Sequence, residues 1–302
     1  MKSFLRPRTL NCKAERAAPW HDGGNPDVFE TSAFPLSRFS LFHRIRDALA
    51  CPGIEQKLGL VGALAQDCRE GNLIILREDS GPPKRRGTPP GMATVRPAHL
   101  PRRRTDTGSG LAALFHSVAH IEYTAIDLAL DHACRFPTFP DAYYRAWIEV
   151  AAEEARHFAL VRERLRHYGH DYGDFPVHKG LWEMAQKTAD DALARMALVP
   201  RLMEARGLDA TPPMQEKLKR AGDLEGVRIL GVILYDEVGH VALGDRWFRW
   251  LCRERGLTVE TTFRDLIETY RAPWPSAPMN EEARLAAGFT GEELAGLMRR
   301  TR

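Results

Sequence analysis

Two stretches of the sequence decide the fold: WIEVAAEEARHFALV at residues 147–161 and ILGVILYDEVGHVALG at residues 229–244. Each holds a Glu-x-x-His motif, which begins at Glu154 in the first stretch and at Glu237 in the second. Side chains three residues apart lie on one face of an α-helix, so each pair can bind one metal ion. An isolated pair of this kind is usually a solvated surface pair. Here the flanking residues are apolar, and a buried carboxylate without a partner is costly, so the two motifs together predict a metal site inside a helical bundle.

A lone carboxylate precedes each motif at nearly the same spacing. Glu122 lies 32 residues before Glu154, and Glu204 lies 33 residues before Glu237. Four carboxylates and two imidazoles are the ligand set of di-iron and di-manganese four-helix bundles. Carboxylate oxygen and imidazole suit these metals. We predict two metal ions, with iron first and manganese or a mixed Mn/Fe pair as alternatives. The predicted ligands are Glu122, Glu154, His157, Glu204, Glu237 and His240.

Residues close to these ligands are candidates for supporting roles. Asp236 precedes Glu237 and could hydrogen-bond a ligand histidine, although a surface position fits equally well. A tyrosine near a metal can carry a radical, but most such tyrosines only pack. Glu153 could replace its neighbour as a ligand only in a shifted register. The remaining candidates are Tyr123 and Tyr235 beside the ligands, and His116 and His120, which we expect to pack or to support ligands rather than bind metal.

Helical periodicity dominates the chain from residue 109 onward, with Gly or Pro at the expected helix ends. The fold class predicted is all-α: a ferritin-like four-helix bundle with an N-terminal helical extension and short C-terminal helices. Its four long helices are expected over residues 111–136, 139–168, 190–207 and 223–256, with a short helical piece over 214–222 and two short helices in the tail. The predicted divisions are 1–108 (a helical segment and a Pro/Arg-rich arm), 109–256 (the bundle) and 257–302 (the tail).

The connection between the second and third helices limits where the third can begin. In a ferritin-like bundle these two helices run parallel and need a long crossover. One helix over residues 180–207 would leave only about a dozen residues for that crossover, too few at about 3.3–3.6 Å each. We therefore expect residues 180–190 to form a separate piece and the bundle helix to begin near Asp190. Pro200 predicts a bend that aims Glu204 at the metals, or else a fresh helix start.

Composition excludes several classes. The chain has 302 residues, 44% hydrophobic and 27% charged, which is ordinary for a globular protein. It holds no apolar run of membrane-spanning length and no secretory leader pattern, and its five scattered cysteines include no CxxC. These features predict a cytoplasmic protein without a membrane partner. The net charge of +3 is too small to indicate nucleic acid. Residues 80–108 hold seven Lys/Arg and six prolines, which favours a solvated loop over a phosphate-binding arm.

The stretches HIEYTAIDLALDHACRF, AAEEARHFALVRERL, LVPRLMEARGLD and DEVGHVALGDRWFRWLC, together with HDYGDFPVHKGLWEMAQKTADD, resemble the family catalogued as domain of unknown function 455. The resemblance extends over about residues 41–295. That family is regarded as ferritin-like and is similar in type to the bacterial tRNA hydroxylases of the MiaE type. The resemblance implies the bundle and a dimetal site on the six predicted ligands, and it supplies no substrate.

These observations support three hypotheses about function. The first is a dinuclear non-haem oxidoreductase that uses dioxygen to oxidise a small-molecule substrate, with an external electron donor. The second is a tRNA-modifying hydroxylase, which would employ the basic arm. The third is a ferroxidase or other iron-handling protein without an organic substrate. A homodimer is compatible with each of them.

Overall fold

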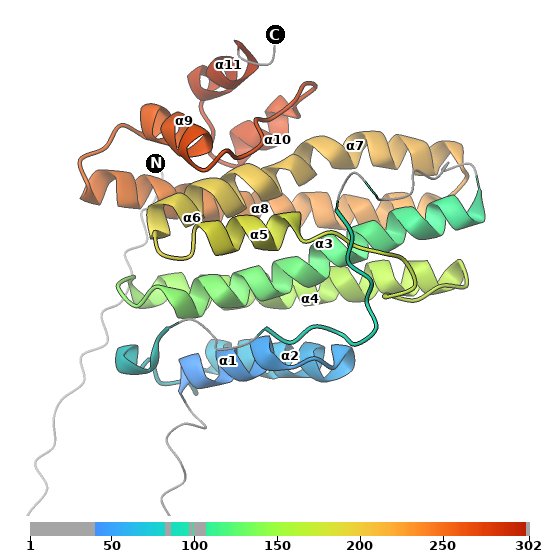
Figure 1. Ribbon diagram of the computed structural model, residues 1–302, viewed down its shortest axis with the longest axis horizontal. Coiled ribbons are helices and arrows are strands. Elements are labelled where there is room, and N and C mark those ends of the chain that lie inside the picture. Colours follow the sequence, from blue (N-terminus) through green and yellow to red (C-terminus); the bar gives the residue numbers. More distant parts are fainter. Residues whose placement is uncertain (1–39, 82–85, 97–98, 100–106, 300–302) are drawn as a thin grey trace, which may run out of the picture. The chain divides into compact units, whose positions relative to one another are not determined.

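The computed structural model describes residues 40–81, 86–96, 99 and 107–299, and the described residues are helical, with isolated β-bridges and no strand (Figure 1). The predicted N-terminal loop, parts of the basic arm and the last three residues lie outside the described ranges. No helix in these ranges is both long and apolar enough to cross a membrane. The elements are α1 (Leu41–Ala50), α2 (Ile54–Glu70), η2 (Arg77–Asp79), α3 (Gly108–Arg135), α4 (Asp141–His167), α5 (Gly180–Lys187), α6 (Ala192–Leu198), η4 (Val199–Glu204), α7 (Ala205–Arg220), α8 (Leu224–Glu254), α9 (Val259–Thr269), α10 (Glu281–Ala286) and α11 (Gly291–Arg299).

Four long helical rods form the bundle: α3, α4, α8 and the continuous run of α6, η4 and α7. The predicted bounds of the first, second and fourth are confirmed to within about three residues. Side-chain caps fix their starts, since Thr107 accepts a hydrogen bond from Gly110 N–H and Asp223 accepts one from Gly226 N–H. Gly169 and Gly256 take left-handed φ values just past the ends of α4 and α8.

The third rod begins where the length argument requires. The segment predicted to be separate is the short helix α5, and α6 starts at Ala192 with the Asp191 side chain as its N-cap. The chain runs back along α5 before it enters α6. As a result α4 and the third rod point the same way, while α3 and α8 point the other way (Figure 1).

The predicted end of the third helix at Gly207 is wrong. Helix α7 continues to Arg220 and contains both Pro212 and Pro213. A proline here removes the N–H that would bond the Leu208 carbonyl. The side-chain amide of Asn280 donates to that carbonyl instead, at 3.2 Å. The C-terminal segment thus replaces one of the hydrogen bonds that the two prolines remove.

Pro200 neither ends the rod nor starts a new one. It lies in η4, a π-helical turn that carries one extra residue per turn and includes Glu204. Helix α8 packs tightly against this turn at Gly244, where an added Cβ would lie only 2.4 Å from Cβ of Pro200. The local irregularity and the close approach together set the position of Glu204 relative to α8.

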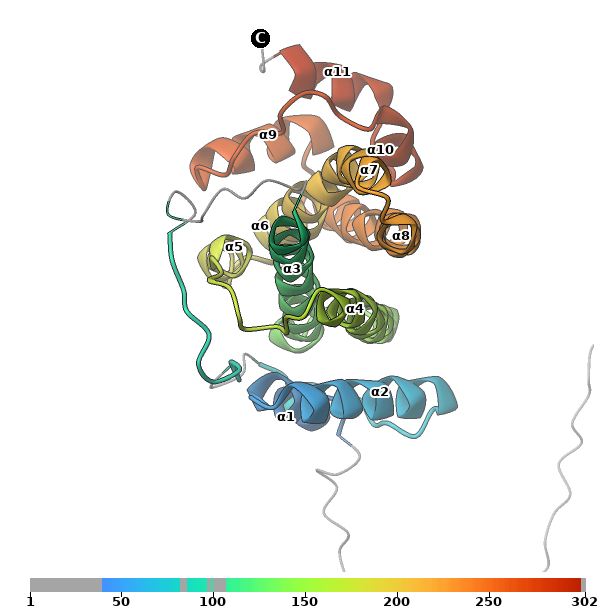
Figure 2. The ribbon, with the colours of Figure 1, turned by 90° about the vertical axis from the view of Figure 1, so that its right-hand side faces the viewer.

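The flanking helices pack on opposite sides of the bundle. Figure 2 shows α1 and α2 against α3 and α4, and the C-terminal helices against α7 and α8. The tail forms three helices rather than the two predicted. Buried ion pairs join the layers: Lys57 of α2 pairs with Asp127 of α3, and Arg284 of α10 pairs with Asp209 of α7 at 2.6 Å.

The described part of the basic arm is a surface loop in which most residues are exposed, as predicted, but it is held to the bundle at several points. Arg86 pairs with Asp127 at 2.6 Å and lies over the Trp182 ring. Gly87 N–H donates to the Leu49 carbonyl, and Thr94 forms a parallel bridge with Val177. The arm is thus held to the same crossover that carries α5.

Two histidines of α3 also hold the connection between α4 and α5, as their predicted packing role implies. His116 Nε2 accepts a hydrogen bond from Gly173 N–H at 2.9 Å. The two ring nitrogens of His120 lie 2.9 Å from the Tyr172 hydroxyl and from the His178 carbonyl. Burial lowers the pKa of each ring to about 4. Both rings are therefore neutral near pH 7.

Acid should weaken the fold through His116. Its folded pKa lies below the unfolded value of about 6.5. The unfolded chain then takes up the proton first, so the free energy of unfolding falls as the pH drops from about 6.5 to about 4. Urea titrations at pH 7 and pH 5 measure how far the free energy of unfolding drops between these two pH values. The drop should be smaller for His116→Gln than for the parent, by roughly 1 kcal/mol after solvent screening. His167→Gln, at an exposed site on α4, is the control and should behave as the parent does. Equal losses in parent and His116→Gln would contradict this prediction.

Candidate metal centre

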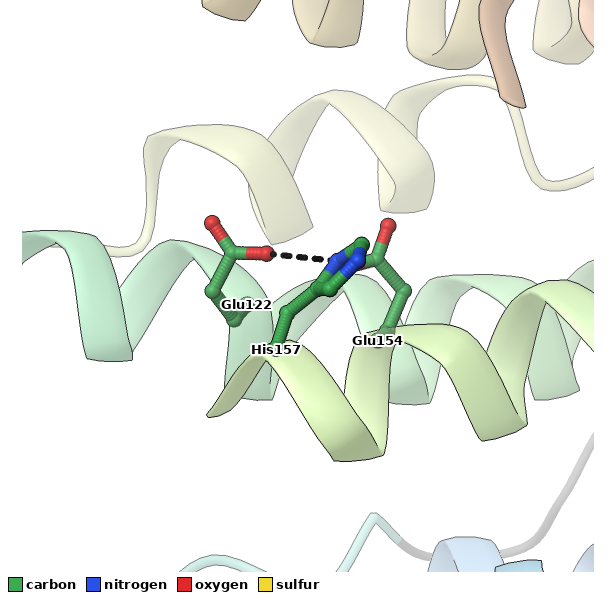
Figure 3. A group of neighbouring side chains, drawn as sticks. All are labelled: Glu122, Glu154 and His157. Atoms are coloured by element: carbon green, nitrogen blue, oxygen red, sulfur yellow. Dashed lines mark hydrogen bonds and ion pairs between the residues drawn. The ribbon is translucent and has the colours of Figure 1, made fainter. Parts of the chain in front are cut away.

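The structure gathers the predicted ligands of α3 and α4 at the middle of the bundle. Nδ1 of His157 lies 3.4 Å from a Glu122 oxygen and 3.2 Å from a Glu154 oxygen, and all three side chains are buried. Figure 3 shows that the Glu122 side chain comes from α3, while Glu154 and His157 come from neighbouring turns of α4. These three donor atoms lie close enough together to hold one metal ion.

A second group on α8 uses the same Glu154. Nδ1 of His240 lies 2.9 Å from Glu154 Oε1 and 3.3 Å from Glu237 Oε2. Donor atoms of these three residues also lie within reach of a single ion. The two imidazole rings are 5.8 Å apart between centroids. One carboxylate therefore belongs to both groups, and each of its oxygens faces a different histidine.

Glu204 lies beside these groups without joining either compact set. It lines the same cavity as Glu122, Glu154 and Glu237. Burial, and then the charges of Glu237 and Glu154, raise its pKa well above the usual value. All six predicted ligands thus converge on one place, five in the compact groups and Glu204 in the lining of the cavity that Glu122, Glu154 and Glu237 also line. We call these six residues the carboxylate–histidine cluster.

The residue before each motif holds the histidine of the other motif. Asp236 on α8 lies 2.9 Å from Nε2 of His157 on α4. Glu153 on α4 lies 2.7 Å from Nε2 of His240 on α8. The supporting position predicted for Asp236 is where the structure places it. The equivalent position of Glu153 was missed, because only the packing of α4 against α8 reveals it. The sequence did carry one signal for this role, because an acidic residue directly precedes the Glu-x-x-His motif in both helices.

These outer contacts determine which ring nitrogen faces inward. An Nε2–H that donates to a carboxylate leaves Nδ1 with a lone pair in the neutral ring. That lone pair then faces carboxylate oxygens, which is favourable only if a proton or a cation lies between them. Nδ1 of His240 has no aligned hydrogen-bond partner among the described residues, despite its short distance to Glu154. The donor set therefore fits a metal ion.

Without a cation the cluster must hold protons. Burial, followed by the charge of Glu154, raises the pKa of Glu122 to about 8. Burial opposes protonation of His157, but hydrogen bonds to Glu122 and Glu154 raise its pKa to about 10. Burial also opposes ionisation of Glu154, yet His240 and His157 keep its pKa below the usual value. The one shared carboxylate is thus the most acidic member, and positive charge is favoured around it.

Of the two candidate tyrosines, one is buried and the other is exposed. Tyr123 is buried, its ring packs on Phe158 and Tyr172, and its hydroxyl has no partner among the described residues. Tyr235 is 82% exposed. It precedes Glu237 by two residues, and about 200° of helix rotation turns it away from the cluster. The supporting role predicted for Tyr235 is therefore wrong.

Removing either outer carboxylate should loosen the cluster. We expect Asp236→Asn to lower metal affinity about 10- to 100-fold, because His157 would lose the charge that fixes its ring. Glu153→Gln should act on His240 in the same way but less strongly, because this carboxylate is 40% exposed. Competition with a chelator would measure both effects. Glu163→Gln, at an exposed position on α4, is the matched control, and equal affinities for Asp236→Asn and this control would contradict the assigned contact.

The fold and site define an all-helical bundle with a buried carboxylate–histidine cluster at its centre. The chain belongs to the family described as "Protein of unknown function (DUF455)", whose model matches residues 50–295. A relative from Haemophilus influenzae, described as an uncharacterized protein, is 47% identical over 207 residues, which is 66% of this chain and 72% of the relative. No solved structure matches the chain significantly.

Proposed function

We propose that this chain is a ferritin-like, dinuclear non-haem metal protein that uses dioxygen to oxidise or hydroxylate an organic substrate. Iron is the metal proposed, because carboxylate and imidazole donors suit it. A bound iron pair would supply the electrons that reduce dioxygen, with an external donor restoring them. A small molecule that enters the cavity is the proposed substrate.

The observation that carries the proposal is the sharing of Glu154 between two buried ligand groups. A structural ion pair needs one carboxylate for each histidine. Here Glu122, Glu154 and Glu237 surround two inward-facing Nδ1 atoms, and Glu204 lies nearby. Burying so many carboxylates is costly unless cations compensate them.

Different residues would hold the metal ions, fix the ligand histidines and bind the substrate. Glu122 and His157 would hold one ion, Glu237, His240 and Glu204 the other, and Glu154 would bridge them. Asp236 and Glu153 would fix the two imidazole rings. The cavity beside the cluster has a volume of about 310 Å³ and is lined mainly by apolar side chains, which would admit a small substrate and exclude bulk water.

The deciding experiment is metal analysis of the purified protein, followed by anaerobic reconstitution with ferrous iron and a dioxygen-consumption assay. We expect two iron ions per chain and consumption of dioxygen once a reductant is added. Fewer than one bound metal per chain after reconstitution would overturn the proposal.

The dioxygen assay and a tRNA-binding titration at several salt concentrations separate the two other hypotheses. A ferroxidase would consume dioxygen in proportion to added iron and would not respond to organic substrates. A tRNA hydroxylase of the MiaE type would bind tRNA with strong salt dependence. The small-molecule proposal is preferred because an apolar-lined cavity of about 310 Å³ lies beside the cluster.

A further inference from the structure

The cavity beside the cluster has two chemically different regions. One side is formed by the carboxylates of Glu122, Glu154, Glu204 and Glu237. The rest is mostly hydrocarbon from α3, η4, α7 and α8, including Val118, Ile121, Met203, Met214, Leu230 and Ile233. Ile121 is 52% exposed, an unusual state for a large apolar side chain in this protein. It marks the side where the cavity meets solvent.

Arg206 adds a cation to this lining. It lies on α7, two residues beyond Glu204, and its side chain is exposed. Two other arginines of the third rod and tail lie in buried ion pairs, Arg201 with Asp245 and Arg284 with Asp209. Among the described residues, no carboxylate lies within ion-pair distance of Arg206. Its guanidinium is therefore available to a ligand.

The charges of the proposed metal site balance without Arg206. On the proposed function, two divalent ions balance the four glutamates of the cluster, so Arg206 is not needed to compensate them. An uncompensated guanidinium at the edge of an apolar cavity favours a ligand with one anionic group. The cavity volume of about 310 Å³ is at the small end for ligand sites, which suits a compact molecule.

We infer that the cavity binds a small, mostly apolar monoanion whose charged group pairs with Arg206 and whose apolar body lies toward Glu122 and Glu154. This inference rests on the proposed function, because the charge balance assumes bound metal. The apolar part of the ligand would be the part nearest the cluster, since Arg206 is the one lysine or arginine side chain among the described residues that line the cavity.

Two probes of equal chain length test the inference. Octanoate and 1-octanol share an apolar body and differ in charge. Titration calorimetry on the protein loaded with ferrous iron, without dioxygen, should show octanoate binding at least about tenfold more tightly than 1-octanol, as expected for a charge-assisted hydrogen bond. Arg206→Gln should remove this preference, and Arg206→Lys should restore part of it.

Matched variants locate the effect. Arg228→Gln removes another exposed arginine, one that is paired with Glu225 away from the cavity, and should leave both affinities unchanged. Ala210→Trp narrows the cavity lining on α7 and should weaken both probes alike. Iron content and helical circular dichroism of each variant report whether it is folded and loaded.

Two outcomes would overturn the inference. The first is an octanoate affinity that does not respond to Arg206→Gln, which would mean that the carboxylate binds the metals directly. The second is binding that does not respond to Ala210→Trp, which would place the probe outside the cavity. A parent protein that binds no iron would instead contradict the proposed function, so the two failures are distinguishable.

Discussion

Replacing Glu154 by alanine should abolish stoichiometric binding of both metal ions. Its two oxygens face two different histidines, at 3.2 Å from His157 and 2.9 Å from His240. Its loss removes one of three compact donors from each group at once. We expect at least about a thousandfold loss of affinity, since each missing anionic ligand is worth several kcal/mol in a buried site. Metal content after anaerobic reconstitution measures the result.

Glu122→Ala is the informative comparison for this prediction. Glu122 belongs to only one compact group, so this variant should retain close to one metal per chain. Glu163→Ala changes an exposed glutamate of α4 and should retain two. If Glu154→Ala keeps two ions, or loses no more than Glu122→Ala does, the bridging assignment is wrong.

The largest effect on stability should come from Arg201→Leu. This arginine is completely buried in η4, where it donates to Asp245 at 2.6 Å and to Glu293 at 2.8 Å. Its guanidinium also lies 4.1 Å from the centre of the Phe263 ring. Removing one partner of a buried ion pair leaves charge without compensation and costs about 3–5 kcal/mol. Urea unfolding should show a loss of this size.

An exposed ion pair provides the control for this prediction. Arg228 pairs with Glu225 on the surface of α8, and Arg228→Leu should cost less than about 1 kcal/mol. Turn η4 carries both Arg201 and Glu204. The Arg201→Leu variant should therefore also bind more weakly the metal ion that Glu204 is proposed to hold. A stability loss below about 1 kcal/mol would show that Arg249, which contacts the same two carboxylates, replaces Arg201.

Local rules predicted the long helices because their ends depend on nearby residues. Gly169, Gly256 and the caps at Thr107 and Asp223 lie within the segments that they terminate. Chain length alone was enough to separate α5 from α6. The six cluster residues could also be named from spacing, since a helix brings residues three apart onto one face.

The errors arose where distant parts of the chain decide the outcome. A double proline normally ends a helix, but Asn280 restores the bond to Leu208 from 72 residues away. Glu153 acquires its role only when α8 packs against α4. Tyr235 was misjudged because neighbours in a helical sequence point in different directions.

The reciprocal contacts between the two motifs have a consequence for the order of assembly. Asp236 and His157 are 79 residues apart, and Glu153 and His240 are 87 residues apart. Each Glu-x-x-His motif alone offers one carboxylate and one imidazole whose ring is not yet fixed. During synthesis the site therefore stays incomplete until α8 has emerged and closed against α4, which is a slow, long-range step. On the proposed function, the ion held by Glu154, Glu237 and His240 could bind only after α8 has closed against α4, whereas the group of Glu122, Glu154 and His157 on α3 and α4 could form earlier.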